Sequence, residues 1–144
     1  MKINGKVRRL SQPASLESLM QSVQRMDTDR CEIVLIDGSL AVGNVDCNEA
    51  WRTIKEQGLR CIAARELSRR VYRDGINNGI AVIELPTVPP VASGTEIEVD
   101  LLQGRINWTE DGSGKAVAFA AYNDHLIGII NAGGLVEFAK QSFR

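Results

Sequence analysis

The sequence has few residues that could bind a metal ion or form covalent cross-links. It contains one histidine, His125, and three cysteines, Cys31, Cys47 and Cys61. A single histidine cannot build a metal site alone, and the cysteines are spaced too widely for a Cys-x-x-Cys clip. Their odd number also argues against a disulfide framework. Cys31 and Cys61 lie in or beside apolar stretches, so both are predicted to be small buried residues.

The sequence also lacks a strong net charge and long apolar runs. The 144 residues carry a formal net charge of −1, so no basic field is present to attract nucleic acid or an anionic membrane. No stretch approaches the roughly 18 apolar residues of a membrane span, and the start MKINGKVRRL lacks the apolar region of a signal peptide. We expect a cytoplasmic protein with a single domain over residues 1–144, and neither nucleic acid nor membrane as a partner.

The central part of the chain alternates between buried strands and helices. Its apolar runs cover residues 33–36, 40–42, 59–64 and 80–85, and they are typical of strands buried on both faces. Helices are expected at residues 49–57, capped by Asn48 and closed by Gly58, and at residues 66–74, stopped by Gly75. This order predicts an α/β fold with parallel strand pairing and right-handed crossovers.

The flanking segments complete the predicted fold. Residues 3–10 alternate well enough for an edge strand, and Ser15 precedes a helix that carries apolar residues at helical spacing. After a proline-rich crossing loop, an antiparallel meander is expected at residues 96–102, 105–109 and 115–121. A helix capped by Asn123 or Asp124 and ended by Gly133-Gly134 then precedes a short final helix.

The polar turn at residues 43–49, which we call the 43–49 loop, is where chemistry is expected. Cys47 lies just before a predicted helix, where the helix dipole can lower the pKa of a thiol and make it a nucleophile. The competing interpretation is an incidental small residue in a loop.

Basic residues are concentrated at Arg65, Arg69, Arg70 and Arg73, which the prediction places on two turns of one helix. Arg69 and Arg73 form an i, i+4 pair of like charges, which costs a helix some stability. The group is either a solvated face screened by salt or a contact for an anion, such as a carboxylate substrate or an acidic partner surface.

Several segments, in the same order along the chain, resemble one protein family. They are GLRCIAA at residues 58–64, Leu67, Arg69, Tyr72-Arg73 and INNGI at residues 76–80, with residues 4–7 near the start and 132–136 near the end. On these residues the chain resembles the small subunit of 3-isopropylmalate dehydratase, whose fold is the swivelling domain of the aconitase superfamily. The likeness spans most of the chain, and the shared order carries more weight than any one segment.

The resemblance implies a swivelling β/β/α domain with a parallel core sheet, a C-terminal antiparallel meander and a helix. It implies a hydro-lyase subunit of leucine biosynthesis that binds no cofactor itself and docks on a large subunit carrying a [4Fe-4S] cluster. Such enzymes move a hydroxyl between adjacent carbons of a di- or tricarboxylic acid. In the family, a Gly-Ser-Ser-Arg-Glu loop approaches the cluster: a serine alkoxide abstracts the proton, and the arginine binds a substrate carboxylate.

This chain departs from the family at that loop, which here reads GNVDCNE. When Glu49 is matched to the family's glutamate, Asp46 and Cys47 take the positions of the two serines and Asn48 takes that of the arginine. A match without gaps shifts all of these correspondences by one residue. Asparagine cannot supply the charged, bidentate fork of arginine. The catalytic candidates are Asp46 and Cys47, and the candidates for substrate binding are Asn44, Asn48, Glu49, Arg69 and Arg73.

Two functions remain open at this point. In the first, the chain is the small subunit, or a divergent homologue, of a dehydratase that works with a cluster-bearing large subunit. In the second, it is a stand-alone swivel domain that lacks the serine and arginine and self-associates as a homo-oligomer. Restored activity of a large subunit would favour the first function, whereas a stable homo-oligomer without such a partner would favour the second.

Overall fold

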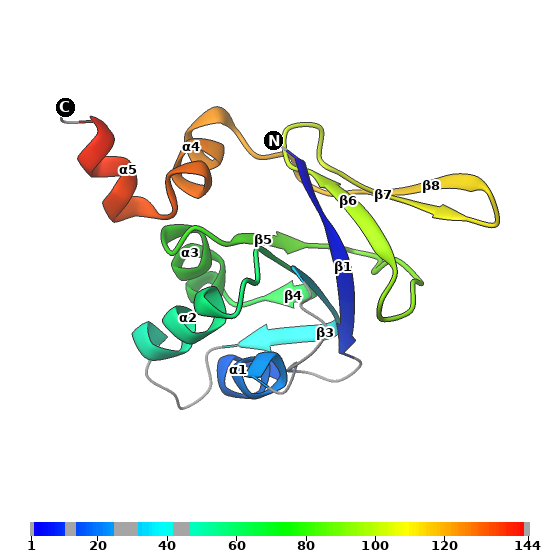
Figure 1. Cartoon of the computed structure of the whole chain (residues 1–144), viewed down its shortest axis with the longest axis horizontal. Coiled ribbons are helices and arrows are strands. Elements are labelled where there is room, and N and C mark those ends of the chain that lie inside the picture. The colour runs from blue at the N-terminus through cyan, green and yellow to red at the C-terminus, as the bar shows by residue number, and fades with distance from the viewer. Residues whose placement is uncertain (1, 11–13, 25–31, 42–46, 143–144) are drawn as a thin grey trace.

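The computed structural model describes residues 2–10, 14–24, 32–41 and 47–142. These residues form eight strands and five helices in the predicted α/β arrangement (Figure 1). The elements are β1 (Lys2–Leu10), β2 (Ala14–Ser15), α1 (Leu16–Gln24), β3 (Ile33–Ala41), α2 (Cys47–Glu56), β4 (Cys61–Leu67), α3 (Arg69–Asn77), β5 (Ala81–Glu84), β6 (Glu96–Asp100), β7 (Arg105–Glu110), β8 (Ser113–Ala118), α4 (Asp124–Ala132) and α5 (Leu135–Ser142). No helix among them is long and apolar enough to cross a membrane.

Strands β3, β4 and β5, the second half of β1 and the short β2 beside β3 form the parallel part of the sheet. Alternate residues of each strand face opposite sides, so Ile62 and Val82 contribute to one core while Cys61 and Ile83 contribute to the other. Helices α1, α2 and α3 cover the first side, where Trp51 of α2 is almost fully buried. The predicted alternation of parallel strands and crossover helices is therefore confirmed.

Strand β1 joins the parallel strands to the antiparallel strands. Residues 2–6 pair antiparallel with β6, and residues 7–10 pair parallel with β3. The prediction of an edge strand here is wrong, because β1 is interior to the strand order β5-β4-β3-β1-β6-β7-β8. Alternating apolar residues indicate that a strand has a buried face, but they do not indicate how many neighbours it has.

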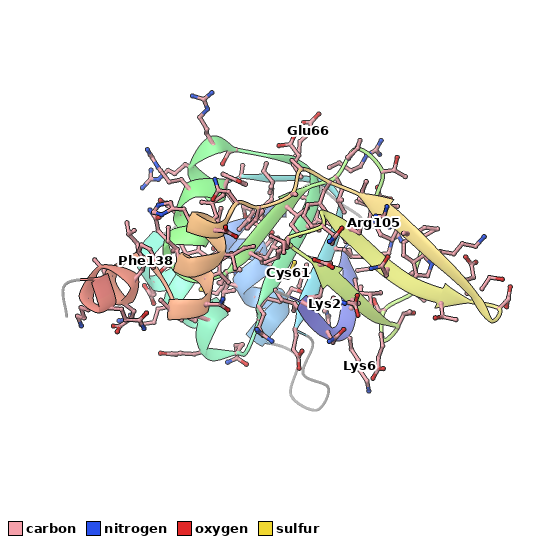
Figure 2. The ribbon with its side chains drawn as sticks, turned by 90° about the horizontal axis from the view of Figure 1, so that it is seen from above. Lys2, Lys6, Cys61, Glu66, Arg105 and Phe138 are labelled. Atoms are coloured by element: carbon pink, nitrogen blue, oxygen red, sulfur yellow. The ribbon has the colours of Figure 1, made fainter. Side chains whose placement is uncertain are left out.

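Strands β6, β7 and β8 form the predicted antiparallel meander. Its inner face, with Ile97 and Ile106, joins α4 in covering the second side of the parallel strands. The β7–β8 hairpin extends from one end of the molecule, and α4 and α5 lie at the other end (Figure 2). Asn123 caps α4, because its Oδ1 accepts a hydrogen bond from Leu126 N at 2.9 Å. This confirms one of the two predicted caps.

The first crossover helix begins slightly earlier than predicted. α2 starts at Cys47, so Asn48 lies in its first turn and is not the residue before the helix. Gly58 follows the helix with φ of 88°, a left-handed conformation that favours glycine. The predicted closing residue is therefore confirmed, and the predicted cap is wrong.

The second crossover helix is displaced by about three residues toward the C-terminus from its predicted position. Ser68 is the N-cap of α3, because its Oγ accepts a hydrogen bond from Val71 N at 3.2 Å. Glu66 and Leu67, predicted to be helical, instead extend β4 by pairing with β3. Long-range strand pairing outweighs the helix propensity of these two residues.

Gly75 lies inside α3, so the prediction that it stops the helix is wrong. A Cβ atom there would lie 2.3 Å from Val82 Cγ2 and 3.0 Å from Trp51 Cη2. The glycine therefore permits α3 to approach β5 and α2 closely. The helix ends at Asn77, and the side chain of Asn78 donates a hydrogen bond to the carbonyl of Asp74 at 2.7 Å.

The turn after α3 packs against the turn between α4 and α5. A Cβ atom on Gly79 would lie 2.6 Å from the carbonyl carbon of Gly133, and one on Gly134 would lie 2.7 Å from Asn77 O. Gly133 has φ of 93° and ends α4, as predicted, while Lys55 of α2 donates a hydrogen bond to its carbonyl. Two glycine motifs that are far apart in the sequence thus meet in one contact.

Candidate functional site

The carboxyl ends of the parallel strands meet at one edge of the sheet, where α/β folds place their ligands. β3 ends at this edge at Ala41, and α2 begins at Cys47. The 43–49 loop therefore connects to the fold at the edge where a ligand is expected.

The structure describes only part of this loop. Asn44 and Asp46 lie outside the described residues. Cys47 and Asn48 form the start of α2, but their side chains are likewise outside the described part. Glu49 is in the first turn of α2 with an exposed side chain. The roles assigned to these five residues therefore stay predictions.

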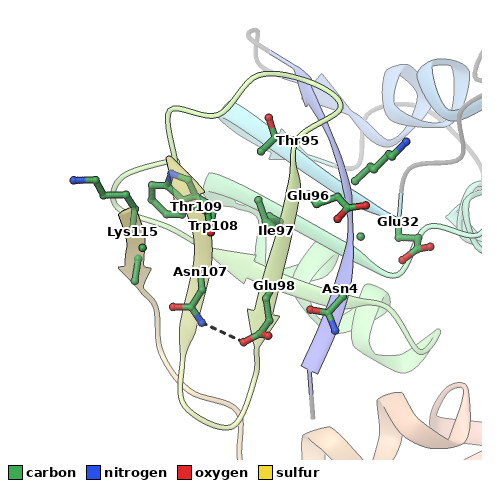
Figure 3. Close-up of a pocket in the computed structure, with 14 residues that line it drawn as sticks. Asn4, Glu32, Thr95, Glu96, Ile97, Glu98, Asn107, Trp108, Thr109 and Lys115 are labelled. Atoms are coloured by element: carbon green, nitrogen blue, oxygen red, sulfur yellow. Dashed lines mark hydrogen bonds between the residues drawn. The ribbon is translucent and has the colours of Figure 1, made fainter. Parts of the chain in front are cut away.

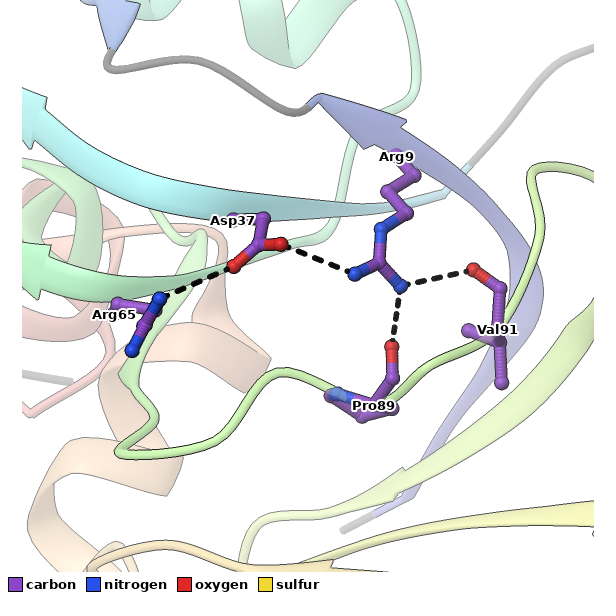
Figure 4. A network of polar contacts seen from close by, with 5 residues as sticks. All are labelled: Arg9, Asp37, Arg65, Pro89 and Val91. Atoms are coloured by element: carbon purple, nitrogen blue, oxygen red, sulfur yellow. Dashed lines mark hydrogen bonds and ion pairs between the residues drawn. The ribbon is translucent and has the colours of Figure 1, made fainter.

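At the same edge, one carboxylate lies between two guanidinium groups (Figure 4). Arg9 Nη2 contacts Asp37 Oδ2 at 3.3 Å, and Arg65 Nη1 lies 3.6 Å from Asp37 Oδ1. Arg9 Nη1 also donates hydrogen bonds to Pro89 O at 2.7 Å and Val91 O at 3.2 Å. Arg9 therefore fixes the crossing loop to the sheet.

Arg65 is less constrained than Arg9. Its side chain is 57% exposed, against 27% for Arg9, and its contact with Asp37 is the longer one. Two cations and one anion give these three side chains together a net charge of +1. This cluster was not predicted as a site, although one signal was present: Asp37 directly follows the apolar run of a buried strand.

The four arginines that were expected on one helix belong to two elements. Arg65 belongs to β4, whereas Arg69, Arg70 and Arg73 belong to α3. The prediction is wrong here because the strand continues beyond Arg65 before the helix begins. Arg70 pairs with Asp74 at 3.5 Å. Among the residues that the structure describes, neither Arg69 nor Arg73 has an acidic partner.

Arg69 and Arg73 line a cleft of about 330 Å³ between α3 and α4, which we call the α3–α4 cleft. Its other lining residues include Tyr72, Ile76, Leu126 and Ile129. The isoleucines are buried, whereas the two arginines and the tyrosine are exposed. The structure therefore brings Arg69 and Arg73 together with apolar side chains, and Glu49 is not among the residues of the cleft.

A second hollow, of about 430 Å³, lies beside strand β5 and shares Tyr72 with the α3–α4 cleft. Tyr122 also lines it; its phenol accepts a hydrogen bond from Val82 N at 2.9 Å and donates one to Val82 O. The phenol thus satisfies the backbone N–H and C=O groups of Val82 at the open edge of β5, where no further strand pairs among the described residues. Burial is the main reason that the pKa of Tyr122 is raised well above its ordinary value, so the phenol stays protonated.

Cys61 is buried in β4, and burial raises the pKa of its thiol to about 12 although the nearby charge of Arg60 lowers it. The thiol is protonated at neutral pH, which confirms the prediction of a small buried residue. Cys31 lies outside the described residues. Within the described part of the chain, no group of three or more His, Cys, Asp or Glu side chains could hold a metal ion.

An open hollow of about 1160 Å³ lies on the outer face of the antiparallel strands (Figure 3). Side chains of both charges line it, among them Lys6, Glu96 and Lys115. Asn107 Nδ2 donates a hydrogen bond to Glu98 Oε1 at 3.4 Å there. Because its charge is mixed, this surface shows no preference for an anionic substrate, and the candidate site remains at the carboxyl edge of the parallel strands.

Three curated relatives illustrate what the chain is similar to. It is 32% identical over 128 residues to the 3-isopropylmalate dehydratase small subunit 1 of Thermotoga maritima, and this match covers 88% of this chain and 72% of that protein. It is 38% identical over 89 residues to the 3-isopropylmalate dehydratase small subunit of Caldicellulosiruptor saccharolyticus, covering 60% and 50%. It is 32% identical over 108 residues to the 2,3-dimethylmalate dehydratase small subunit of Eubacterium barkeri, covering 74% and 64%. The chain thus spans only about half the length of some relatives.

A solved structure has the same fold. The 3-isopropylmalate dehydratase of Methanocaldococcus jannaschii matches with a TM-score of 0.76 and 19% identity, over 99% of this chain and 96% of that chain. The match confirms the predicted fold class. No protein-family model matches the chain.

Proposed function

This chain belongs to the family of 3-isopropylmalate dehydratase small subunits, one member of which it matches at 32% identity over 72% of that member's length. From this premise we propose that it is the small subunit of a hydro-lyase that acts on a substituted malate or a related di- or tricarboxylic acid. The observation that carries the proposal is the similarity over 88% of the chain. The match in fold supports it.

We propose that the reaction also needs a separate large subunit that carries a [4Fe-4S] cluster. Among the described residues, no group of three or more His, Cys, Asp or Glu side chains could hold a metal ion, and the cluster would be bound by the partner. When bound, the cluster would supply Lewis-acid chemistry to the departing hydroxyl. The part of this chain would be to accept the proton from the adjacent carbon and to hold the substrate carboxylates.

The proposed base is Asp46 or Cys47. Cys47 is the first residue of α2, where the positive end of the helix dipole favours a thiolate. Asp46 directly precedes it and would be ionised at neutral pH without such help. Either group would replace the serine of the family. Asn44, Asn48 and Glu49 are the remaining candidates of the loop for hydrogen bonds to the substrate.

We propose that Arg65 compensates in part for the arginine missing from the 43–49 loop. It lies at the carboxyl edge of the sheet, is largely exposed and, among the described residues, forms an ion pair with Asp37. The excess of positive charge in the Arg9–Asp37–Arg65 cluster would attract an anionic substrate and offset repulsion by Asp46. Arg65→Gln should therefore raise KM several-fold with little change in kcat, whereas Arg105→Gln, an exposed change on β7, should leave both unchanged.

Co-expression with the large subunit of a 3-isopropylmalate dehydratase tests the proposal. The two chains should co-purify, and the complex should interconvert 2- and 3-isopropylmalate, followed by the absorbance of the unsaturated intermediate. The large subunit alone is the control. Absence of both complex and turnover with several large subunits, together with a stable homo-oligomer, would contradict the proposal.

Two variants of the active complex identify the base. Asp46→Ala and Cys47→Ala should have unequal effects, and the one that removes the base should lower kcat by about 10² to 10⁴. Gln21→Ala, on the exposed face of α1, is the control. Equal and mild losses from both loop variants would show that the 43–49 loop carries no base.

A further inference from the structure

The α3–α4 cleft has an apolar floor formed by two neighbouring helices. Ile76 of α3 and Ile129 of α4 are each 3% exposed, and the half-buried Leu126 lies beside them. Figure 1 shows the two helices next to one another, with α4 above α3. The volume of about 330 Å³ lies at the lower end of the range for small-molecule sites, about 300–1,000 Å³. The floor suits a compact aliphatic group.

The exposed side of the cleft carries positive charge that no described residue neutralises. Arg69 and Arg73 lie four residues apart on α3 and both line the cleft. Like charges at this spacing destabilise a helix. The neighbouring arginines differ: Arg70 pairs with Asp74, and Arg65 pairs with Asp37. Of the described arginines around Tyr72, the two without an acidic partner are therefore the two that face the cleft.

We infer that the α3–α4 cleft binds a small monocarboxylate with a branched aliphatic tail. The carboxylate would lie between the guanidinium groups of Arg69 and Arg73, which can each offer two parallel donors. The tail would cover Ile76, Leu126 and Ile129, and the Tyr72 phenol would close the open side. The described residues that line it include none from α2, and the site is inferred to be separate from the one proposed at the 43–49 loop. The inference does not depend on the proposed function.

A binding experiment on the isolated full chain tests this inference with 4-methylpentanoate as the probe. Titration followed by amide chemical shifts should show saturable binding, with the largest shifts in α3 and the first turns of α4. The neutral amide of the same acid lacks the charge, and succinate lacks the branched tail. Both should bind at least tenfold more weakly, because each loses one of the two interactions.

Substitutions on α3 separate the cleft from general attraction to basic residues. Arg69→Gln and Arg73→Gln should each weaken binding about tenfold, and the double variant should abolish it. Arg70→Gln is the matched control, because Arg70 is on the same helix but does not line the cleft. It should leave binding unchanged, and unfolding curves should show that all variants are folded.

Four outcomes would overturn the inference. They are no saturable binding of 4-methylpentanoate, equal binding of its amide, equal binding of succinate, or an equal loss in Arg70→Gln. None of these measurements needs a large subunit or turnover. A negative result for binding in the cleft would therefore not contradict the proposed dehydratase function. A negative result for dehydratase activity would likewise not contradict binding in the cleft.

Discussion

Replacing Gly75 with alanine should destabilise the protein, although the same change stabilises an exposed helix. Alanine is favoured over glycine inside a helix by up to about 1 kcal/mol. At Gly75, however, the new methyl group would lie 2.3 Å from Val82 Cγ2 and 3.0 Å from Trp51 Cη2. Carbon atoms pack best at about 3.5–4.0 Å, so both contacts are repulsive. The two effects have opposite signs, and the structure decides which is larger.

The neighbours of Gly75 have little room to move. Val82 is 0% exposed and Trp51 is 1% exposed, so α3 would have to shift away from β5 and α2. Overpacking a core typically costs about 1–3 kcal/mol, and an overlap this severe belongs at the upper end. After the gain in helix propensity, we expect a net loss of about 2 kcal/mol in the free energy of unfolding. This corresponds to a fall in Tm of about 4–8 °C for a chain of this size.

Urea and thermal unfolding followed by circular dichroism measure this loss. Gly114→Ala is the matched control, because a Cβ atom at Gly114 meets nothing within 4 Å, and it should change stability by less than about 0.5 kcal/mol. Val82→Ala removes the atom involved in the closest contact, so adding it to Gly75→Ala should cost less than the sum of the single changes. A Gly75→Ala variant as stable as the wild type would refute the close packing of α3.

Three further predictions concern single side chains. Tyr122→Phe removes both hydrogen bonds to Val82 and should lower the free energy of unfolding by about 1–3 kcal/mol in urea titrations. Cys61 ionises near pH 9 when unfolded and near 12 when folded, so the unfolded state loses its proton first as the pH rises. The free energy of unfolding should therefore fall as the pH rises above 9, and it should fall more steeply in the wild type than in Cys61→Ala. The difference in slope should be up to about 1.4 kcal/mol per pH unit. Asn123→Ala should lower stability by about 1 kcal/mol in thermal unfolding, whereas Asn123→Asp should retain the cap of α4.

Hydrophobic patterning predicted the parallel strands and the alternation of strands with helices. The runs around Ile36, Ile62 and Val82 are continuous because the strands are covered on both faces, and the structure confirms this with a separate core on each side. Glycines that follow helices, such as Gly58 and Gly133, were also predicted correctly, because their left-handed conformation has few alternatives.

Features that depend on long-range contacts were not predictable. Glu66 and Leu67 are good helix formers, but their pairing with β3 keeps them in β4 and moves the helix start beyond Ser68. Gly75 looked like a helix stop, and only the positions of Trp51 and Val82 reveal its packing role. A local sequence window contains none of these partners.

One part of the candidate site was predicted from the sequence and another was not, because the second part depends on long-range contacts. The 43–49 loop was found from its polarity and from the resemblance; β3 ends before it at Ala41, and α2 begins within it at Cys47. The Arg9–Asp37–Arg65 cluster was not found, because its members come from three strands that only the parallel pairing brings together.

The residues that carry the resemblance divide into two groups when their contacts are compared. Gly79 and Gly134 are explained by packing, because a side chain on either would collide with the backbone of the other turn. Arg69 and Arg73 are not explained in this way, since they line a cleft and make no ion pair among the described residues. Because these glycines and arginines are among the residues that resemble the family, differences in chemistry between this chain and its relatives should arise instead in the 43–49 loop, where the sequence departs from the family.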